Sequence, residues 1–111
     1  MKLPPEVFIA RDKLSDYLLV PQPRGDKSRW LARAGYTLNT ADILERDLRA
    51  LALDAEAESV KTDSFGEVFQ IITDLRGPNG RALRAKTIWI REHLSGRVKF
   101  ITLVPVRESR G

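Results

Sequence analysis

The sequence predicts an α+β protein in which three N-terminal helices precede a four-stranded antiparallel β-meander. In the first half of the chain, apolar residues recur at the spacing of a helix, whereas in the second half they alternate with polar residues. Short turn motifs, and no helical segments, separate the stretches of the second half. The strands are therefore expected to follow one another as hairpins, which gives helices packed against an antiparallel sheet.

Length and composition predict a single domain over residues 1–111. Of these residues 42% are hydrophobic and 31% are charged, the balance of an ordinary globular protein. The absence of cysteine excludes disulfides, thiolate metal sites and cysteine nucleophiles. No apolar run approaches the roughly 20 residues of a membrane-spanning helix, and residues 1–6 lack the apolar core of a signal peptide. We therefore expect a cytoplasmic protein without a membrane partner.

The first predicted helix covers residues 12–20. It follows a short apolar and extended stretch over residues 7–10. Two prolines and a glycine within residues 21–25 end it, because neither residue type continues a helix. Its apolar positions recur at helical spacing and are Leu14, Tyr17, Leu18 and Leu19.

A second short helix is predicted over residues 27–34. Asp26 is a favourable N-cap for it, and Gly35 suits its C-terminus because glycine adopts positive φ without strain. This helix would bury Trp30 and Leu31.

The third helix begins at Asn39 or Thr40 and is the clearest of the three. Its apolar stripe is expected to face the core and comprises Ile43, Leu44, Leu48, Leu51 and Leu53. Acidic residues on the first and third helices lie near basic ones, which favours a solvated surface over a catalytic carboxylate pair; they are Asp12, Asp16, Asp42, Glu45 and Asp47.

Four strands are predicted over residues 58–62, 68–75, 81–91 and 97–104. The Gly-Pro-Asn-Gly motif at 77–80 is the strongest local turn motif, because its residues suit a tight reverse turn between two β-rich segments.

The third predicted strand has two chemically different faces. Alternation along a strand places Leu83, Ala85, Thr87 and Trp89 on one face. The other face carries Arg84 and Lys86 together with Ile88 and Ile90. Lys86 and Thr87 therefore point to opposite sides, and the sequence leaves open which side the helices cover.

Positive charge is concentrated in the last third of the chain. Residues 75–111 have a net charge of +7, whereas residues 1–74 have a net charge of −3. Such an asymmetry favours RNA or another polyanion as a partner, although a solvated arginine-rich face has the same composition.

The sequence contains no phosphate-binding loop, no dinucleotide-binding glycine motif and no nucleophile elbow. His93 is the only histidine, and without a second histidine or a cysteine it predicts no zinc site. We therefore expect neither a metal nor another cofactor.

A basic sheet is nevertheless suited to cleaving RNA without a metal. Cations stabilise charge on the phosphoryl oxygens, while a second group accepts the proton of the attacking 2′-hydroxyl. Trp89 is suited either to stacking on a base or to filling the core. The residues of the last two strands that fit such a surface are Arg84, Lys86, Thr87, Trp89, Arg91, Arg97, Lys99 and Thr102.

Several motifs resemble an uncharacterised bacterial family with a GPNG…RTxW…PRFxTxYP ending. They are the turn at 77–80, Lys-Thr-Ile-Trp-Ile at 86–90 and Lys-Phe-Ile-Thr-Leu-Val-Pro at 99–105, with further matches at 13–19 and 26–36. Members of that family occur as free-standing proteins and at the C-termini of polymorphic toxins and phage-head-like proteins. This chain departs from the family pattern at Lys86, at Val98-Lys99 and at Val104, where the family has Arg, Pro-Arg and Tyr.

By fold analogy, the resemblance implies the fold shared by barnase, EndoU, colicin-type and RelE-like ribonucleases. The positions that it carries over as site residues are Lys27, Lys86, Thr87, Trp89 and Thr102. The resemblance also implies a neutralising antitoxin protein, encoded nearby, as a partner.

Three hypotheses follow. The first is a toxin-like, metal-independent ribonuclease of a toxin–antitoxin or bacterial competition system. In it, Lys86 or Arg84 and Lys99 stabilise phosphate charge, Thr102 or Thr87 donates a hydrogen bond to it, and Lys27 or His93 transfers a proton. The second hypothesis is a non-enzymatic module whose basic sheet binds nucleic acid or an acidic protein. The third is an interaction subunit whose exposed sheet edge pairs with another chain.

Overall fold

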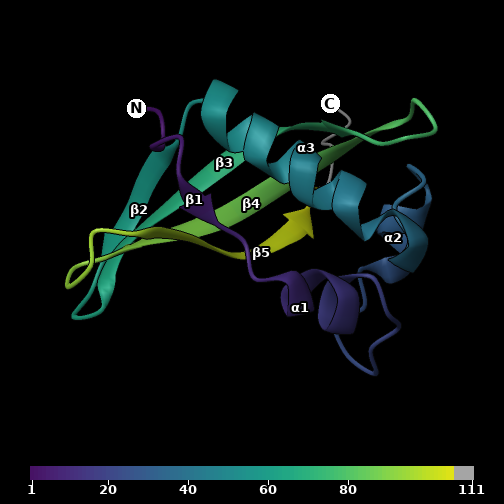
Figure 1. The fold of residues 1–111 in the computed structure, drawn as a ribbon, viewed down its shortest axis with the longest axis horizontal. Coiled ribbons are helices and arrows are strands. Elements are labelled where there is room, and N and C mark those ends of the chain that lie inside the picture. Colours follow the sequence, from purple (N-terminus) through teal and green to yellow (C-terminus); the bar gives the residue numbers. More distant parts are fainter. Residues whose placement is uncertain (107–111) are drawn as a thin grey trace, which may run out of the picture.

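The computed structural model describes residues 1–106, which form an α+β fold built on one five-stranded sheet (Figure 1). The strand order is β1-β5-β4-β3-β2. The strands are β1 (Val7–Phe8), β2 (Glu58–Thr62), β3 (Gly66–Arg76), β4 (Ala82–Glu92) and β5 (Val98–Pro105). The helical segments are α1 (Arg11–Lys13), η1 (Leu14–Leu18), α2 (Ser28–Ala32), η2 (Leu38–Thr40) and α3 (Ala41–Asp54).

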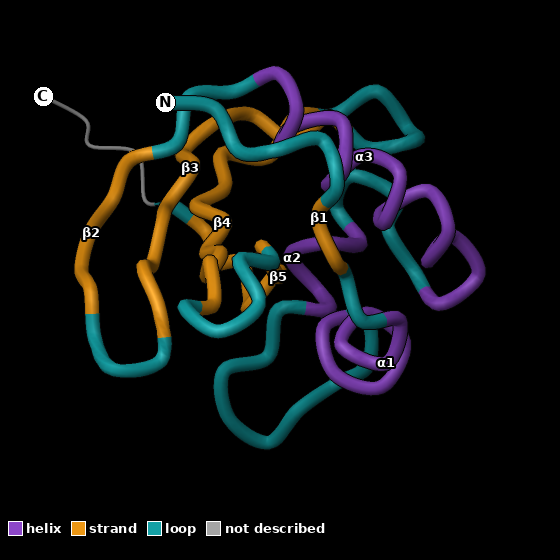
Figure 2. The backbone as a smooth tube through the Cα atoms, turned by 60° about the vertical axis from the view of Figure 1, so that its left-hand side comes forward, coloured by secondary structure: helices purple, strands orange, loops and turns teal. Residues whose placement is uncertain are grey.

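The sheet corrects the predicted four-stranded meander. Strands β2 to β5 are antiparallel neighbours, as predicted, but β1 adds a fifth strand that pairs in parallel with β5. The extended stretch expected over residues 7–10 therefore contributes two residues to the sheet. At the opposite edge, every residue of β2 is exposed. Figure 2 shows β1 and β2 on opposite sides of the sheet.

The first helix is not the regular helix predicted over residues 12–20. It consists of α1 followed by the π-helical η1, in which the Leu19 amide donates to the Leu14 carbonyl at 2.9 Å. The wider turn buries Leu14 and Leu18 but leaves Tyr17 exposed. Tyr17 is therefore not part of the core stripe that the spacing predicted.

The second helix, α2, is shorter than predicted. Lys27 is its N-cap residue, and the Asp26 carboxylate accepts hydrogen bonds from the Ser28 amide at 3.1 Å and hydroxyl at 2.8 Å. Asp26 thus stabilises the helix start from one position earlier than expected. Gly35 has φ of +92°, as expected beyond a helix end.

The Gly-Pro-Asn-Gly turn at 77–80 packs against the end of α2. The Asn79 amide donates to the Ala34 carbonyl at 3.2 Å, and the Asn79 side chain donates to the Arg33 carbonyl at 3.0 Å. A Cβ atom at Gly77 would lie 2.0 Å from the Ala34 carbonyl oxygen, so only glycine allows this approach. The motif therefore joins the β3–β4 hairpin to the helices and leaves no room for a ligand at Gly77.

Helix α3 lies across one face of the sheet (Figure 1). Leu44, Leu48 and Leu51 are buried in the core, but Leu53 is half-exposed, which corrects its placement in the apolar stripe. The backbone before α3 turns through a capping box, in which the Thr37 amide donates to the Thr40 hydroxyl at 2.8 Å.

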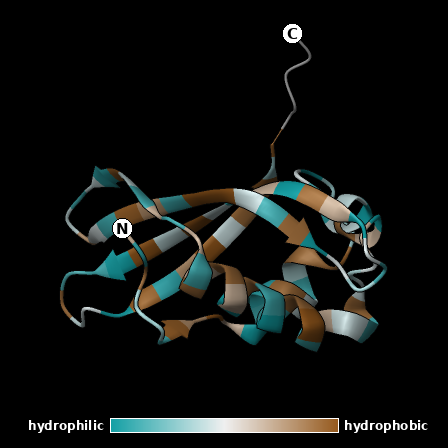
Figure 3. Ribbon diagram, turned by 90° about the horizontal axis from the view of Figure 1, so that it is seen from above, coloured by the Kyte–Doolittle hydropathy of each residue, from teal (hydrophilic) through white to brown (hydrophobic). Residues whose placement is uncertain are grey.

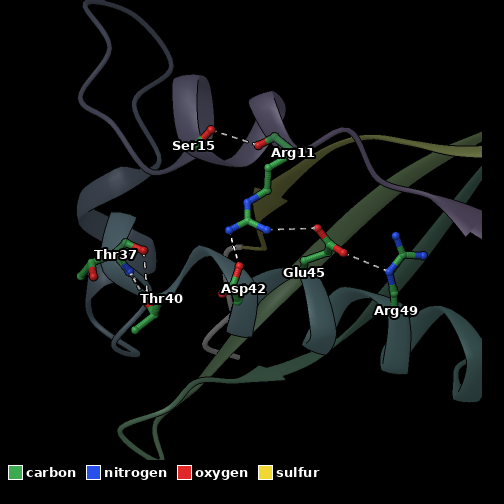
Figure 4. Close-up of polar contacts among 7 residues, drawn as sticks. All are labelled: Arg11, Ser15, Thr37, Thr40, Asp42, Glu45 and Arg49. Atoms are coloured by element: carbon green, nitrogen blue, oxygen red, sulfur yellow. Dashed lines mark hydrogen bonds and ion pairs between the residues drawn. The ribbon is translucent and has the colours of Figure 1, made fainter.

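Ion pairs tie the first helix to α3. Arg11 lies between the carboxylates of Asp42 and Glu45, and Glu45 also pairs with Arg49 (Figure 4). Arg49 in turn donates to the Val7 carbonyl at 2.6 Å. Asp42 is thus an exposed, paired acid as expected, whereas Glu45 is paired but partly buried.

The helices cover the face of the sheet that carries Thr87 and Trp89, which settles the orientation that the sequence left open. The side chains buried on this inner face include Phe69, Ile71, Leu83, Ala85, Thr87, Trp89, Phe100 and Leu103. Figure 3 shows the longest helix on one side of the strands and the opposite side uncovered along most of their length. We call that opposite side the outer face.

Candidate nucleic-acid interface

The outer face is formed by alternate residues of β3, β4 and β5. Lys86 lies opposite Val104, Ile88 opposite Thr102, and Ile90 opposite Lys99 in the β4–β5 pair. On the other side of β4, Lys86 lies opposite Ile72 and Ile88 opposite Gln70. The centre of the face is therefore apolar and partly exposed, with lysines on both sides of it.

Lys27 reaches this face from the start of α2. Its ammonium nitrogen lies 3.3 Å from the Thr102 hydroxyl oxygen, to which it donates a hydrogen bond. The same nitrogen lies 5.7 Å from the centre of the Tyr17 ring, within the range of a cation–π contact. Partial burial lowers the pKa of Lys27, because removing water disfavours the charged form of the amine. The contact joins residues that are 75 positions apart in the chain.

Two backbone irregularities lie beside the Lys27–Thr102 contact. Strand β5 bulges at Ile101, since Trp89 pairs with Phe100 and the preceding Ile88 pairs with Thr102. The Lys13 ammonium donates to the Ile101 carbonyl at 2.9 Å. Lys13 directly precedes the π-helical η1 that carries Tyr17. Bulges and π-helical turns both occur frequently at functional sites, because they redirect side chains.

Lys86 lies close to this contact on the same face. Thr102 faces Ile88, two residues along β4 from Lys86, so Lys86 and Thr102 are diagonal neighbours. Such neighbours have Cβ atoms roughly 7 Å apart, within the reach of a lysine. No carboxylate of residues 1–106 pairs with the Lys86 ammonium. Three of the five predicted catalytic residues, Lys27, Lys86 and Thr102, thus share one part of the surface.

Thr87 and Trp89 do not belong to this surface. Both are completely buried on the inner face. The Thr87 hydroxyl donates to the Ile71 carbonyl at 3.3 Å and accepts a hydrogen bond from the Trp89 indole nitrogen at 2.9 Å. Trp89 also packs edge-to-face on Phe100, with the ring centres 5.2 Å apart. The core interpretation of Trp89 is confirmed. The predicted roles of Thr87 in catalysis and of Trp89 in nucleic-acid binding do not fit side chains that are completely buried.

His93 is also distant from the Lys27–Thr102 contact. Ile88, which faces Thr102, lies four residues before Glu92 on β4, or roughly 13 Å away, and His93 follows Glu92. His93 connects two hairpin ends, since its amide donates to the Phe65 carbonyl at 3.1 Å and its ring Nε2 lies 2.9 Å from the Asp63 carbonyl. This arrangement gives His93 a structural role and separates it from the predicted proton transfer.

The remaining predicted binding cations are largely neutralised or turned away. Arg84 pairs with Asp74 at 3.3 Å, and Lys99 pairs with Glu92 at 3.3 Å, both on the outer face. Arg91 pairs with Glu67 at 2.6 Å on the opposite side of the sheet. Arg97 is exposed in the turn just before β5. The cationic character of the outer face is therefore weaker than the sequence charge predicted.

Part of the positive charge counted in the last third of the chain does not lie on the outer face described here. Arg107 and Arg110, which contributed to the +7 of the last third, lie outside the described residues. Acids on β3 pair with Arg84 and Arg91, and Glu92 at the end of β4 pairs with Lys99. Counting charges along the chain missed the first two pairs because Asp74 and Glu67 belong to the acidic part of the sequence before residue 75.

The donor atoms at the candidate site are amines and hydroxyls. Over residues 1–106 no group of three or more His, Asp or Glu side chains gathers in a way that could hold a metal ion. No helix of that part of the chain is long and apolar enough to cross a membrane. The chemistry available at Lys27, Lys86 and Thr102 is therefore charge stabilisation, hydrogen bonding and proton transfer by amines.

Two aromatic residues of the outer surface were missed by the sequence analysis. Tyr17 was assigned to an apolar helix stripe, but it is 45% exposed beside Lys27. Phe8 was assigned to an apolar lead-in, but it is 49% exposed, with the Lys99 ammonium 5.9 Å from its ring centre. The spacing of residues gave no sign of the π-helical turn or of the parallel β1–β5 pair that expose these rings.

Comparison with known proteins places the whole described fold within one family. The family described as domain of unknown function DUF6883 matches residues 3–107, which include both the helices and the sheet. No match was found among curated proteins or among solved structures. Since the match covers nearly the whole chain, this protein belongs to the DUF6883 family.

Proposed function

We propose that this protein is a metal-independent ribonuclease of the toxin type, with its active site around Lys27, Lys86 and Thr102 on the outer face. The observation that carries the proposal is the Lys27–Thr102 contact at 3.3 Å, which brings an amine of lowered pKa to the open side of the sheet. Lys86, a diagonal neighbour of Thr102, supplies the second cation. A base and a cation are the elements required for attack of an RNA 2′-hydroxyl on the adjacent phosphorus.

In the proposed reaction, the neutral amine of Lys27 accepts the proton of the RNA 2′-hydroxyl. The 2′-oxygen attacks the adjacent phosphorus and forms a new P–O bond, while the bond from phosphorus to the 5′-oxygen breaks. Water gives a proton to the departing 5′-oxygen. The products are a 2′,3′-cyclic phosphate and a 5′-hydroxyl, so atoms and charges balance without a metal or an oxidant.

Each side chain has a defined part in this reaction. Thr102 holds the Lys27 nitrogen in place through its hydroxyl oxygen. The Lys86 ammonium stabilises the charge on the phosphoryl oxygens, as a positioned cation does at the transition state. The lowered pKa of Lys27 increases the fraction of neutral amine at a given pH.

The biological setting proposed here rests on the family resemblance. A ribonuclease of a toxin–antitoxin or competition system requires a protein that blocks its active site. The outer face is a suitable target because its lysines and isoleucines are both partly exposed. We propose a neutralising antitoxin protein, encoded nearby, as the partner that covers this surface.

The test is cleavage of a labelled single-stranded RNA by purified protein in the presence of EDTA. We expect Lys27→Ala and Lys86→Ala to lower kcat/KM by about a hundredfold or more, the range for a lost proton-transfer group or charge-stabilising cation. Lys61→Ala is the matched control, since Lys61 is an exposed lysine on the edge strand β2. If Lys27→Ala and Lys86→Ala keep the same kcat/KM as Lys61→Ala, the proposal is overturned.

A second candidate function is a non-enzymatic module that binds nucleic acid. It is favoured by the lack of any imidazole beside Lys27 in the described part of the chain, because binding alone needs no proton-transfer group. Binding of RNA that weakens steeply with salt, without any cleavage, would support this alternative.

A further inference from the structure

Two aromatic–lysine pairs lie along β5. The Phe8 ring lies beneath the Lys99 ammonium at 5.9 Å, and the Tyr17 ring lies beneath the Lys27 ammonium at 5.7 Å. Phe8 is 49% exposed and Tyr17 is 45% exposed, so each ring keeps accessible surface. An exposed aromatic ring with a cation beside it offers both a stacking partner for a base and a counter-charge for a phosphate.

The two pairs are joined through β5 itself. Phe8 is the register partner of Lys99 in the parallel β1–β5 pair. The Tyr17–Lys27 pair is fixed to the same strand by the Lys27–Thr102 hydrogen bond. Lys99 faces Ile90 and Thr102 faces Ile88, two residues apart on β4, so the two pairs are attached to β5 roughly 7 Å apart along the strand direction.

We propose that the outer face binds single-stranded RNA, with bases stacked on Phe8 and Tyr17 and phosphates beside Lys99, Lys27 and Lys86. The inference rests on the proposed function for its choice of RNA and adds the strandedness of the substrate and the residues that receive its bases. Bases that are already paired in a duplex cannot stack on side chains, whereas unpaired bases can. Stacking accepts every base, so recognition is expected to depend little on sequence.

An acidic protein is a less suitable ligand for this row of residues. Lys99 already has a carboxylate partner in Glu92 at 3.3 Å, so for any anionic ligand charge contributes less at that end than the exposed Phe8 ring does. Phe8, in contrast, has no role in the core, because it lies on the outer face. The exposed part of this row is thus aromatic rather than charged, which favours bases over carboxylates as ligands.

The test measures binding without cleavage. The probe is a fluorescent single-stranded 2′-O-methyl oligonucleotide of about eight nucleotides, a length within the range of single-strand binding sites. It has no 2′-hydroxyl and cannot be cleaved by the proposed reaction. Its Kd is measured by fluorescence anisotropy and compared with that of an abasic strand of the same length and of the duplexed probe.

We expect the abasic strand and the duplex to bind more weakly than the single strand. Phe8→Leu and Tyr17→Leu, which keep an apolar side chain but remove the ring, should each raise Kd by between about fivefold and a hundredfold. Tyr17→Phe should bind as the wild type does, because the ring is kept. Phe65→Leu is the matched control, since Phe65 is 77% exposed in the turn between β2 and β3.

Equal binding of the intact and abasic strands would overturn the inference, as would unchanged Kd values for Phe8→Leu and Tyr17→Leu. A competition experiment gives a further contradicting result. If polyglutamate displaces the probe as effectively as unlabelled single strand does at the same charge concentration, the inference is overturned in favour of an acidic protein ligand. The outcomes separate this inference from the proposed reaction. Ring-dependent binding without RNA cleavage would support the inference and contradict the ribonuclease proposal. RNA cleavage together with normal probe binding by Phe8→Leu and Tyr17→Leu would support the ribonuclease proposal and contradict the inference.

Discussion

The indole nitrogen of Trp89 donates a hydrogen bond to the Thr87 hydroxyl oxygen at 2.9 Å, inside the core between the sheet and the helices. Because the Thr87 hydroxyl in turn donates to the Ile71 carbonyl, both polar groups are satisfied without water. Thr87→Val should leave the indole N–H unpaired and lower the free energy of unfolding by about 1–3 kcal/mol. Urea unfolding followed by tryptophan fluorescence measures this loss.

The control for that prediction is Thr87→Ser, which keeps the hydroxyl and should be less destabilising. Folded Thr87→Val protein should also keep the RNA cleavage activity of the wild type. A selective loss of cleavage with unchanged stability would contradict the placement of Thr87 in the core.

Gly77 is required by its approach to the end of α2. A Cβ atom there would lie 2.0 Å from the Ala34 carbonyl oxygen, and backbone must move to relieve the clash. We expect Gly77→Ala to lower the free energy of unfolding by about 1–3 kcal/mol, the range of other overpacked sites. Gly80→Asn is the comparison, because Gly80 has open space around it and asparagine tolerates its φ of +88°. In thermal unfolding, the Tm of Gly77→Ala should therefore be clearly lower than that of Gly80→Asn.

The lowered pKa of Lys27 predicts a pH-dependent reaction rate. Since the neutral amine accepts the 2′-hydroxyl proton, kcat/KM should rise with pH and level off above that pKa, which lies below the ordinary lysine value. The profile is measured between about pH 6 and pH 10. Lys27→Ala should lose this rise, and a rise that persists in Lys27→Ala would assign it to another group.

The same shift has a consequence for stability. A lysine whose folded pKa is lowered binds fewer protons in the folded state than in the unfolded state, so its contribution to stability increases as pH rises from the folded to the unfolded pKa. Burial of the charged amine therefore opposes folding below the folded pKa, the expected arrangement for a residue retained for function.

His93 should be dispensable for RNA cleavage. His93→Ala removes the contact between the imidazole Nε2 and the Asp63 carbonyl, and should lower the free energy of unfolding by about 1 kcal/mol. The cleavage rate of the folded variant, measured at the pH of maximum activity, should equal that of the wild type. A loss of about a hundredfold would restore His93 as the proton-transfer group.

The α+β class, the positions of α3 and of β2 to β5, and the role of the turn at 77–80 follow from local patterns in the sequence. Alternation along β4 predicted that Lys86 and Thr87 face opposite sides, which the structure confirms. The strand pairing of residues 7–8 could not be predicted, because two residues carry no alternation and their partner is more than 90 positions away.

The candidate site was predicted only in part for a similar reason. Lys27 meets Thr102 across 75 residues, beside a π-helical turn and a β-bulge that the local sequence pattern did not indicate. Ion pairs such as Arg91–Glu67 formed between strands and reduced the charge that a linear count suggested. Local spacing thus identified the lysines and the threonine, and tertiary packing decided which of them meet.

The most direct test of the ribonuclease proposal is mass spectrometry of the ends of a cleaved oligoribonucleotide. The predicted products have a 2′,3′-cyclic phosphate on one fragment and a 5′-hydroxyl on the other, and a single 2′-deoxy substitution at the cleaved position should block the reaction. Lys27→Ala should produce neither fragment at a comparable rate. Intact RNA after prolonged incubation with the wild-type protein, or cleavage that continues at the 2′-deoxy position, would contradict the proposed function.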